Sequence, residues 1–132
     1  MERVKERLQV ARQALTTLQE LAEKPNLTVL ERDAAIQRFE YTFEAAWRAA
    51  QTFLYEFEGV AANSPKSAVR ASWQAGLLDE VSSQAALRMC EARNMTVHTY
   101  NEKLAQEIAD QVPDFARLIE TWLSAMEAQF VA

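Results

Sequence analysis

Apolar side chains recur at alternating steps of three and four residues in the first part of the chain, which predicts an amphipathic helix. The positions expected to face inward are Val4, Leu8, Ala11, Leu15, Leu18 and Ala22. We expect this helix to end near the stretch "EKPN", because Pro25 cannot occupy a helix interior without losing a hydrogen bond.

A second helix is expected to begin at "TVLE", where Thr28 can cap the first turn and Glu31 can reach back to form a capping box. Gly59 is expected to stop it, since glycine adopts the left-handed conformation that ends many helices. One wide inward face is predicted for Phe39, Phe43, Ala46, Trp47, Ala50, Phe53, Leu54 and Phe57.

Two shorter helices follow in the prediction. The third has Ser64 as its cap and Pro65 in its first turn, with Gly76 near its end. The fourth starts at Asp79, and Arg88 falls at the edge of its apolar face. The inward residues predicted for the third helix are Val69, Trp73 and Leu77. Those predicted for the fourth helix are Val81, Ala85, Met89 and Ala92.

The last part of the chain predicts two more helices. A short fifth one is capped by Asn101, and the last one begins with "PDFARLIETW". Its inward residues are Phe115, Leu118, Ile119, Trp122, Met126 and Phe130. Only 2 Gly and 3 Pro are present, which disfavours a turn-rich β fold. The pattern therefore predicts an all-α, antiparallel up-and-down bundle of four main helices plus one or two short ones, in a single domain over 1–132.

Composition and charge disfavour several classes of function. The formal net charge is -5 and no cluster of Lys and Arg occurs, which disfavours tight non-specific binding to duplex nucleic acid. The stretch "MERVKERLQV" predicts no signal peptide, no apolar run is long enough to span a membrane, and a single cysteine, Cys90, fits a reducing compartment. A cytoplasmic protein is expected. With one His and one Cys, no metal site or cofactor is predicted, and the pair Glu40 and Glu44 is interpreted as a solvated face.

The stretch "EARNMTVHTY" at 91–100 carries the chain's only histidine, His98, between Arg93 and Tyr100. On a continuous helix these three side chains would diverge, since each residue turns about 100°. The β-branched run of Thr96, Val97 and Thr99 favours extended backbone, so we expect the helix to end near Asn94 or Met95. His98 and Tyr100 would then project to one side, with Arg93 leaning towards them.

Histidine can move protons near neutral pH and arginine can hold a phosphate, a combination that suits RNA cleavage. Because each chain has one histidine, a mechanism with two histidines requires a homodimer in which two motifs meet. Part of the abundant apolar surface of the second and last helices would seal that dimer, or simply fill the core. The plain alternative for the motif is that Arg93 and His98 are ordinary residues of a helix end.

The segment "RNMTVH" at 93–98, extended by "TY", resembles the Arg-x4-His-x-Tyr pattern of HEPN domains. The stretches "RFEYTFEAAWRAAQTFL" (38–54), "SPKSAVRASWQAGLLDE" (64–80) and "RNMTVHTYNEKLAQEI" (93–108) also resemble the HEPN subfamily of nucleotidyltransferase substrate-binding proteins. This resemblance covers nearly the whole chain.

The resemblance implies a homodimer that works with a minimal nucleotidyltransferase as its partner. It implies a metal-independent endoribonuclease site in which Arg93 stabilises the phosphate, His98 transfers protons and Asn94 orients the site. It also implies that the partner transfers AMP onto Tyr100 and thereby blocks RNA, as in toxin–antitoxin pairs. The other reading that it allows is a non-catalytic subunit that docks the nucleotidyltransferase and helps to bind nucleotide or substrate.

Overall fold

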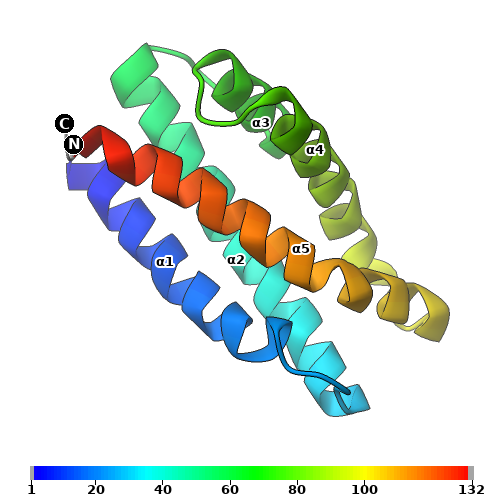
Figure 1. Ribbon diagram of the computed structural model, residues 1–132. Helices are drawn as coiled ribbons and strands as arrows, with labels where there is room; N and C mark the ends of the chain where they lie inside the picture. Colours follow the sequence, from blue (N-terminus) through cyan, green and yellow to red (C-terminus); the bar gives the residue numbers. More distant parts are fainter. Residues whose placement is uncertain (1, 131–132) are drawn as a thin grey trace.

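A computed structural model describes residues 2–130, which fold into an all-α bundle (Figure 1). The helices are α1 (Glu2–Ala22), α2 (Val29–Glu58), α3 (Pro65–Gln74), α4 (Glu80–Met95) and α5 (Glu102–Glu127), and two 3₁₀ turns are η1 (Thr96–His98) and η2 (Ala128–Phe130). The expected set of four main helices with a short one is therefore confirmed.

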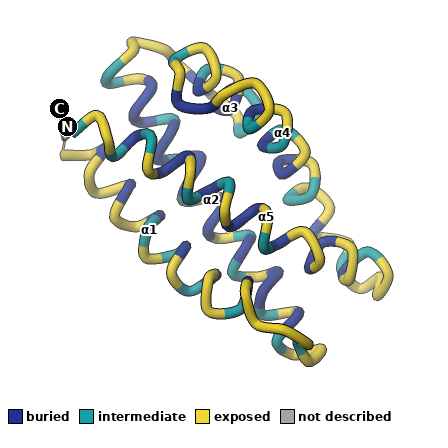
Figure 2. Tube along the Cα trace, viewed as in Figure 1, coloured by how far each residue is buried: buried dark blue, intermediate teal, exposed yellow. Residues whose placement is uncertain are grey.

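Three long helices, α1, α2 and α5, form the centre of the bundle, and the α3–α4 hairpin packs on α2 and α5 (Figure 1). Buried positions line the inner faces of these helices, while their outer faces are exposed (Figure 2). The chain returns to its starting end, where Lys5 Nζ of α1 lies 5.5 Å from the ring centroid of Phe130. Among the described residues, no helix is long and apolar enough to cross a membrane.

Helix ends follow the local signals in the sequence. The hydroxyl of Thr28 accepts a hydrogen bond from the Glu31 backbone N–H, and the Glu31 carboxylate accepts one from the Thr28 N–H, which completes the predicted capping box. Gly59 ends α2 in the left-handed conformation, with φ of 66°. Ser64, Asp79 and Asn101 cap α3, α4 and α5 as expected.

The prediction of two separate helices at the end of the chain is wrong, because α5 runs without interruption through Pro113. Proline removes one backbone hydrogen bond from a helix interior. The buried face nevertheless continues across it, from Val112 to Phe115, and Phe115 stacks on Phe39 of α2 with ring centroids 5.1 Å apart. Packing against α1 and α2 thus outweighs the loss of that hydrogen bond.

The inward face predicted for α4 is also wrong, except at Met89. The buried residues of this helix are Ser83, Ala86, Met89 and Cys90. Val81 is 77% exposed, and Ala85 and Ala92 are only half-buried. Small residues let α4 approach its neighbours closely, so the bundle selects this face although another face is more apolar. Trp73 of α3 was expected inside and is 47% exposed, whereas Val69 and Leu77 are buried as predicted.

Candidate active site

The residues of the Arg-x4-His-x-Tyr motif lie in the tight connection between α4 and α5, at one end of the bundle (Figure 1). Helix α4 ends at Met95, which confirms the predicted helix end. The extended backbone expected after it is not formed. Residues 96–98 make the 3₁₀ turn η1 instead, and the Asn101 backbone N–H donates to the His98 carbonyl at 3.0 Å to close the connection.

Threonine hydroxyls explain why this connection is a turn. Thr96 Oγ1 donates to the Arg93 carbonyl at 2.7 Å, and Thr99 Oγ1 donates to the Thr96 carbonyl at 3.1 Å. Each hydroxyl thus bonds to a carbonyl three residues earlier, an interaction that competes with extended structure. β-Branching suggested a strand, whereas the spacing of the threonines behind the helix end favours the turn that the structure shows.

Arg93 is held by two partners that the sequence did not identify. Its Nη1 donates to Thr96 Oγ1 at 3.0 Å and lies 3.6 Å from Glu40 Oε2 on α2. Thr96 is buried, and the side chains of Arg93 and Glu40 are 30% and 33% exposed. Glu40 is thus not the solvated residue that was expected. The guanidinium is oriented before any ligand arrives, and part of its charge is balanced by a carboxylate.

Glu44, the other residue of the pair expected on a solvated face, has partners only within its own helix. It accepts hydrogen bonds from Trp47 Nε1 at 2.9 Å and Arg48 Nε at 3.1 Å, both within α2. Only the approach of α4 to α2 distinguishes the two glutamates, since both lie on the same helix. No signal in the sequence would have separated them.

His98 and Tyr100 lie together on the surface, with ring centroids 6.0 Å apart in an edge-to-face arrangement. Tyr100 is 83% exposed, and both His98 and the neighbouring Asn94 are exposed as well. Within residues 2–130, Arg93 makes its contacts with Thr96 and Glu40 and makes no hydrogen bond with His98. The fold therefore brings the imidazole of His98 and the phenol of Tyr100 together. It anchors the guanidinium of Arg93 separately, at the same junction between α4 and α5.

An exposed apolar stripe on α4 leads to the motif. Val81, Arg88 and Met95 are seven residues apart, which places them on one side of a helix. Val81 is 77% exposed and Met95 is 43% exposed, and the next apolar residue, Val97 in η1, is 67% exposed. We call Val81, Arg88, Met95 and Val97 the α4 stripe. Exposed apolar side chains that adjoin reactive groups are typical of a surface that another molecule covers.

Two further properties limit the chemistry. Cys90 is buried, and burial raises the pKa of its thiol to about 11, so the thiol stays protonated and unreactive near neutral pH. Among residues 2–130, no three His, Cys, Asp or Glu side chains gather closely enough to hold a metal ion. The motif thus offers solvent an imidazole, a phenol and a partly exposed guanidinium.

Comparisons with known proteins agree on the family. The sequence model described as "Nucleotidyltransferase substrate binding protein like" matches residues 6–128. A Haemophilus influenzae protein named "Probable ribonuclease HepT" is 31% identical over 91 residues, which cover 66% of this chain and 60% of that protein. The match thus spans less than two thirds of the relative's length.

Solved structures share the fold. A Thermus thermophilus protein is 50% identical, with a TM-score of 0.86 over 88% of this chain and 98% of its own. A mutant of the toxin–antitoxin MntA-HpeT matches with a TM-score of 0.79 at 15% identity, over 97% and 99% of the two chains. HI0074 from Haemophilus influenzae, described as a substrate-binding domain of a nucleotidyltransferase, matches with a TM-score of 0.72 at 21% identity, over 91% and 98%. The last two likenesses concern the fold alone.

Proposed function

The chain belongs to the HEPN-type family of nucleotidyltransferase substrate-binding proteins, and on that premise we propose that it is the ribonuclease component of a two-protein nucleotidyltransferase system. The proposal rests chiefly on one observation, that His98 and Tyr100 are exposed together in the turn that follows a pre-oriented Arg93. The name of the Haemophilus influenzae relative supports the same activity.

In the proposed reaction, a 2′-hydroxyl oxygen of RNA attacks the adjacent phosphorus. The bond from phosphorus to the 5′-oxygen of the next nucleotide breaks, which leaves a 2′,3′-cyclic phosphate and a 5′-hydroxyl that takes up a proton. His98 accepts or returns a proton, as an exposed imidazole can do near neutral pH. Arg93 stabilises the charge that develops on the phosphate, with Thr96 fixing its guanidinium at 3.0 Å. Asn94, on the last turn of α4, orients the RNA. No step uses a metal ion.

A second copy of the chain completes the site in this proposal. Cleavage needs one group to take a proton and another to give one, and each chain contains one histidine. The α4 stripe adjoins the motif and is exposed in the single chain, so pairing two stripes would bring two motifs together. The homodimer is therefore proposed as the catalytic unit, with Arg93 and His98 contributed by both copies.

We propose Tyr100 as the regulatory switch. Its hydroxyl oxygen would attack the α-phosphate of ATP on the partner nucleotidyltransferase, forming a phosphodiester and releasing pyrophosphate, while the phenol proton passes to solvent. The 83% exposure of Tyr100 makes such access feasible. The added phosphate would lie next to His98, whose ring is 6.0 Å away, and would repel the RNA backbone.

The test is cleavage of single-stranded RNA by the purified protein in excess chelator. We expect wild type to cut and His98→Ala to lose cutting by at least about 100-fold, the usual contribution of a general acid or base. Unfolding of the variant should match wild type, because His98 is exposed. Glu107→Gln, at an exposed position of α5 outside the motif, is the control. Cutting that survives His98→Ala would remove His98 from the mechanism.

One observation favours the alternative of a non-catalytic subunit that docks the nucleotidyltransferase. Glu40 lies 3.6 Å from Arg93, and its carboxylate competes with a phosphate for the same guanidinium. The two functions separate on co-expression with the partner and ATP, followed by intact-mass measurement and peptide mapping. AMP on Tyr100 that disappears in Tyr100→Phe supports the regulated ribonuclease. Tight partner binding without RNA cutting or added mass supports the docking subunit.

A further inference from the structure

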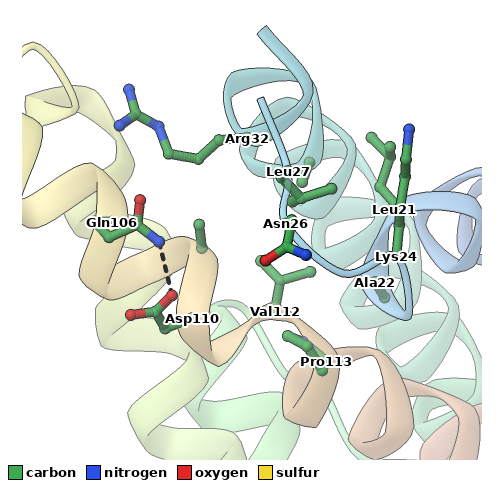
Figure 3. Close-up of a pocket in the computed structure, with 12 residues that line it drawn as sticks. Leu21, Ala22, Lys24, Asn26, Leu27, Arg32, Gln106, Asp110, Val112 and Pro113 are labelled. Carbon is green, nitrogen blue, oxygen red and sulfur yellow. Dashed lines mark hydrogen bonds between the residues drawn. The ribbon is translucent and has the colours of Figure 1, made fainter. Parts of the chain in front are cut away.

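Figure 3 shows a pocket of about 390 Å³. It lies at the α1–α2 loop, at the same end of the bundle as the α4–α5 connection (Figure 1). The α1–α2 loop and the first half of α5 form its walls, and α2 lies behind it. The pocket adjoins the motif along α5, because its lining residue Gln106 is one helical turn after Glu102, which follows Tyr100 by two residues.

Locally unfavourable features collect around this pocket. Pro113 interrupts the hydrogen bonding inside α5. Arg32 is only 6% exposed although it is charged. Both line the pocket. Features that oppose folding persist where function requires them, which marks this pocket as a candidate binding site.

The charges at the pocket argue against an anionic ligand. Arg32 donates to Glu102 at 2.7 and 3.3 Å and to Asp33 at 3.0 and 3.1 Å, and Lys24 is paired with Glu31. Figure 3 shows the Arg32 side chain extending away from Asn26. Both cations therefore have carboxylate partners and are not presented to a phosphate.

The free hydrogen-bonding groups are mainly acceptors. The Asp110 carboxylate accepts one bond, from Gln106 Nε2 at 2.8 Å, and keeps further acceptor capacity (Figure 3). The Ala109 carbonyl has lost its usual helical donor, because Pro113 has no N–H. Apolar side chains of Leu27, Ala35 and Val112 supply the remaining surface. The matching ligand has an apolar ring and carries N–H donors.

We infer that this pocket binds a nucleobase with an exocyclic amino group, such as adenine or cytosine. The amino group would donate to Asp110 and to the Ala109 carbonyl, and the ring would lie on Leu27 and Val112. The base can come from a free nucleoside or from single-stranded RNA. The RNA source rests on the proposed ribonuclease function, whereas binding of a nucleoside does not.

The first experiment titrates the purified full chain with matched nucleosides, followed by NMR or calorimetry. Adenosine is compared with inosine, and cytidine with uridine, because each second member replaces the amino group by a carbonyl. We expect the amino nucleosides to bind about tenfold more tightly, the effect of one net hydrogen bond. Equal affinities within a pair, or no binding of adenosine or cytidine, would overturn the inference.

A variant locates the binding. Asp110→Asn exchanges one acceptor oxygen for a donor, so the preference for adenosine over inosine should shrink several-fold. Asp110 is exposed, and an asparagine there can still accept from Gln106, so folding should be kept. Asp114→Asn is the matched control, one turn along α5 at a residue paired with Arg117. An equal loss of preference in both variants would place the site elsewhere.

The RNA source is tested with short oligonucleotides of adenosine or inosine on the His98→Ala chain, so that cleavage cannot interfere. A preference for the adenosine oligomer that Asp110→Asn removes would identify RNA as the source. The same affinity for both oligomers, alongside selective binding of adenosine itself, would identify the free nucleoside. If the wild-type protein does not cleave RNA, selective binding of adenosine would still support the pocket as a nucleobase site, because that binding does not rest on the ribonuclease function.

Discussion

Helices α1 and α4 differ in how their apolar residues are used. In α1, all six positions of the predicted stripe are buried, from Val4 to Ala22. In α4, Val81 of the predicted stripe is 77% exposed and the buried face is instead built on Ser83, Ala86, Met89 and Cys90. The first helix places its apolar surface in the core. The second leaves Val81 exposed in its first turn, while Arg93 lies in its last turn, just before His98 and Tyr100.

This difference shows that exposed apolar positions occur at both ends of α4. Val81 lies in its first turn, whereas Met95 and Val97 adjoin the candidate chemistry. A chain that only had to fold would gain from burying Val81 and Met95, since buried apolar area stabilises by roughly 25 cal/mol per Å². Their exposure is consistent with a surface reserved for another molecule, for which we propose a second copy of the chain.

The largest expected effect extends the contrast between buried and exposed apolar residues to two tryptophans. Trp122 of α5 is fully buried and its Nε1 donates to Ser72 Oγ at 3.0 Å, whereas Trp73 of α3 is 47% exposed. Trp122→Ala should lower the free energy of unfolding by about 3–5 kcal/mol, through a cavity and an unpaired hydroxyl. Trp73→Ala should lower it by about 1 kcal/mol or less. Urea denaturation measures both, and similar losses would contradict the contrast.

The second prediction tests the α4 stripe. Val81→Asp places a charge in the first turn of α4, where an acidic side chain suits the helix dipole, so the monomer should stay folded. If two stripes pack together, the buried charge should weaken the dimer by about 2 kcal/mol or more, roughly 30-fold in its dissociation constant.

The matched control is Val29→Asp, in the first turn of α2 and 58% exposed. Analytical ultracentrifugation of the two variants and wild type gives the dissociation constants. Weakening by Val29→Asp alone would assign the interface to the start of α2 instead of the α4 stripe.

A third, smaller effect compares two helix caps. Asn101 accepts from the Leu104 N–H at 3.1 Å beside the motif, and Thr28 accepts from the Glu31 N–H at 3.1 Å in the α1–α2 loop. Replacing either by alanine should lower stability by about 1 kcal/mol. Only Asn101→Ala should also reduce RNA cleavage, because Asn101 holds the end of the turn that carries His98. A cleavage loss of the same size in Thr28→Ala would mean that stability alone sets activity.

The smallest predicted effect concerns the ion pair that ties α5 to α2. The hydrogen bond from Arg32 lowers the pKa of Glu102 below its usual value of 4.5. A carboxylate with a lowered folded-state pKa stabilises the fold above its unfolded-state pKa, and this stabilisation disappears as the pH falls through the folded-state value. The Glu102 side chain is 74% exposed, so solvent screening keeps the effect small.

Thermal unfolding between pH 3 and pH 7 tests this prediction. Glu102→Gln should lower the melting temperature slightly at pH 7, and the difference from wild type should shrink as the pH falls below about 4.5. Glu107→Gln, at an exposed position of the same helix, serves as the control. A difference that stays constant across this range would show that ionisation of Glu102 is not involved.

Several features of the fold follow from the sequence because their causes are local. The stripe of α1, the capping box of Thr28 and Glu31, the stop at Gly59 and the end of α4 at Met95 each depend on residues within a turn or two. The composition of the motif is likewise set by the sequence, since Arg93, His98 and Tyr100 are close in the chain. Local spacing and backbone preference were sufficient for all of these.

The tertiary structure decided what depends on neighbouring helices. Helix α5 continues through Pro113, because the packing of Val112 and Phe115 stabilises it by more than the loss of one hydrogen bond destabilises it. The tertiary structure turned the α4 stripe outward and brought Glu40 from the middle of α2 to within 3.6 Å of Arg93. It also formed the pocket from a loop and a helix that are about eighty residues apart in the chain. Contacts between distant segments have no period in the sequence, so only the folded bundle could place these groups together.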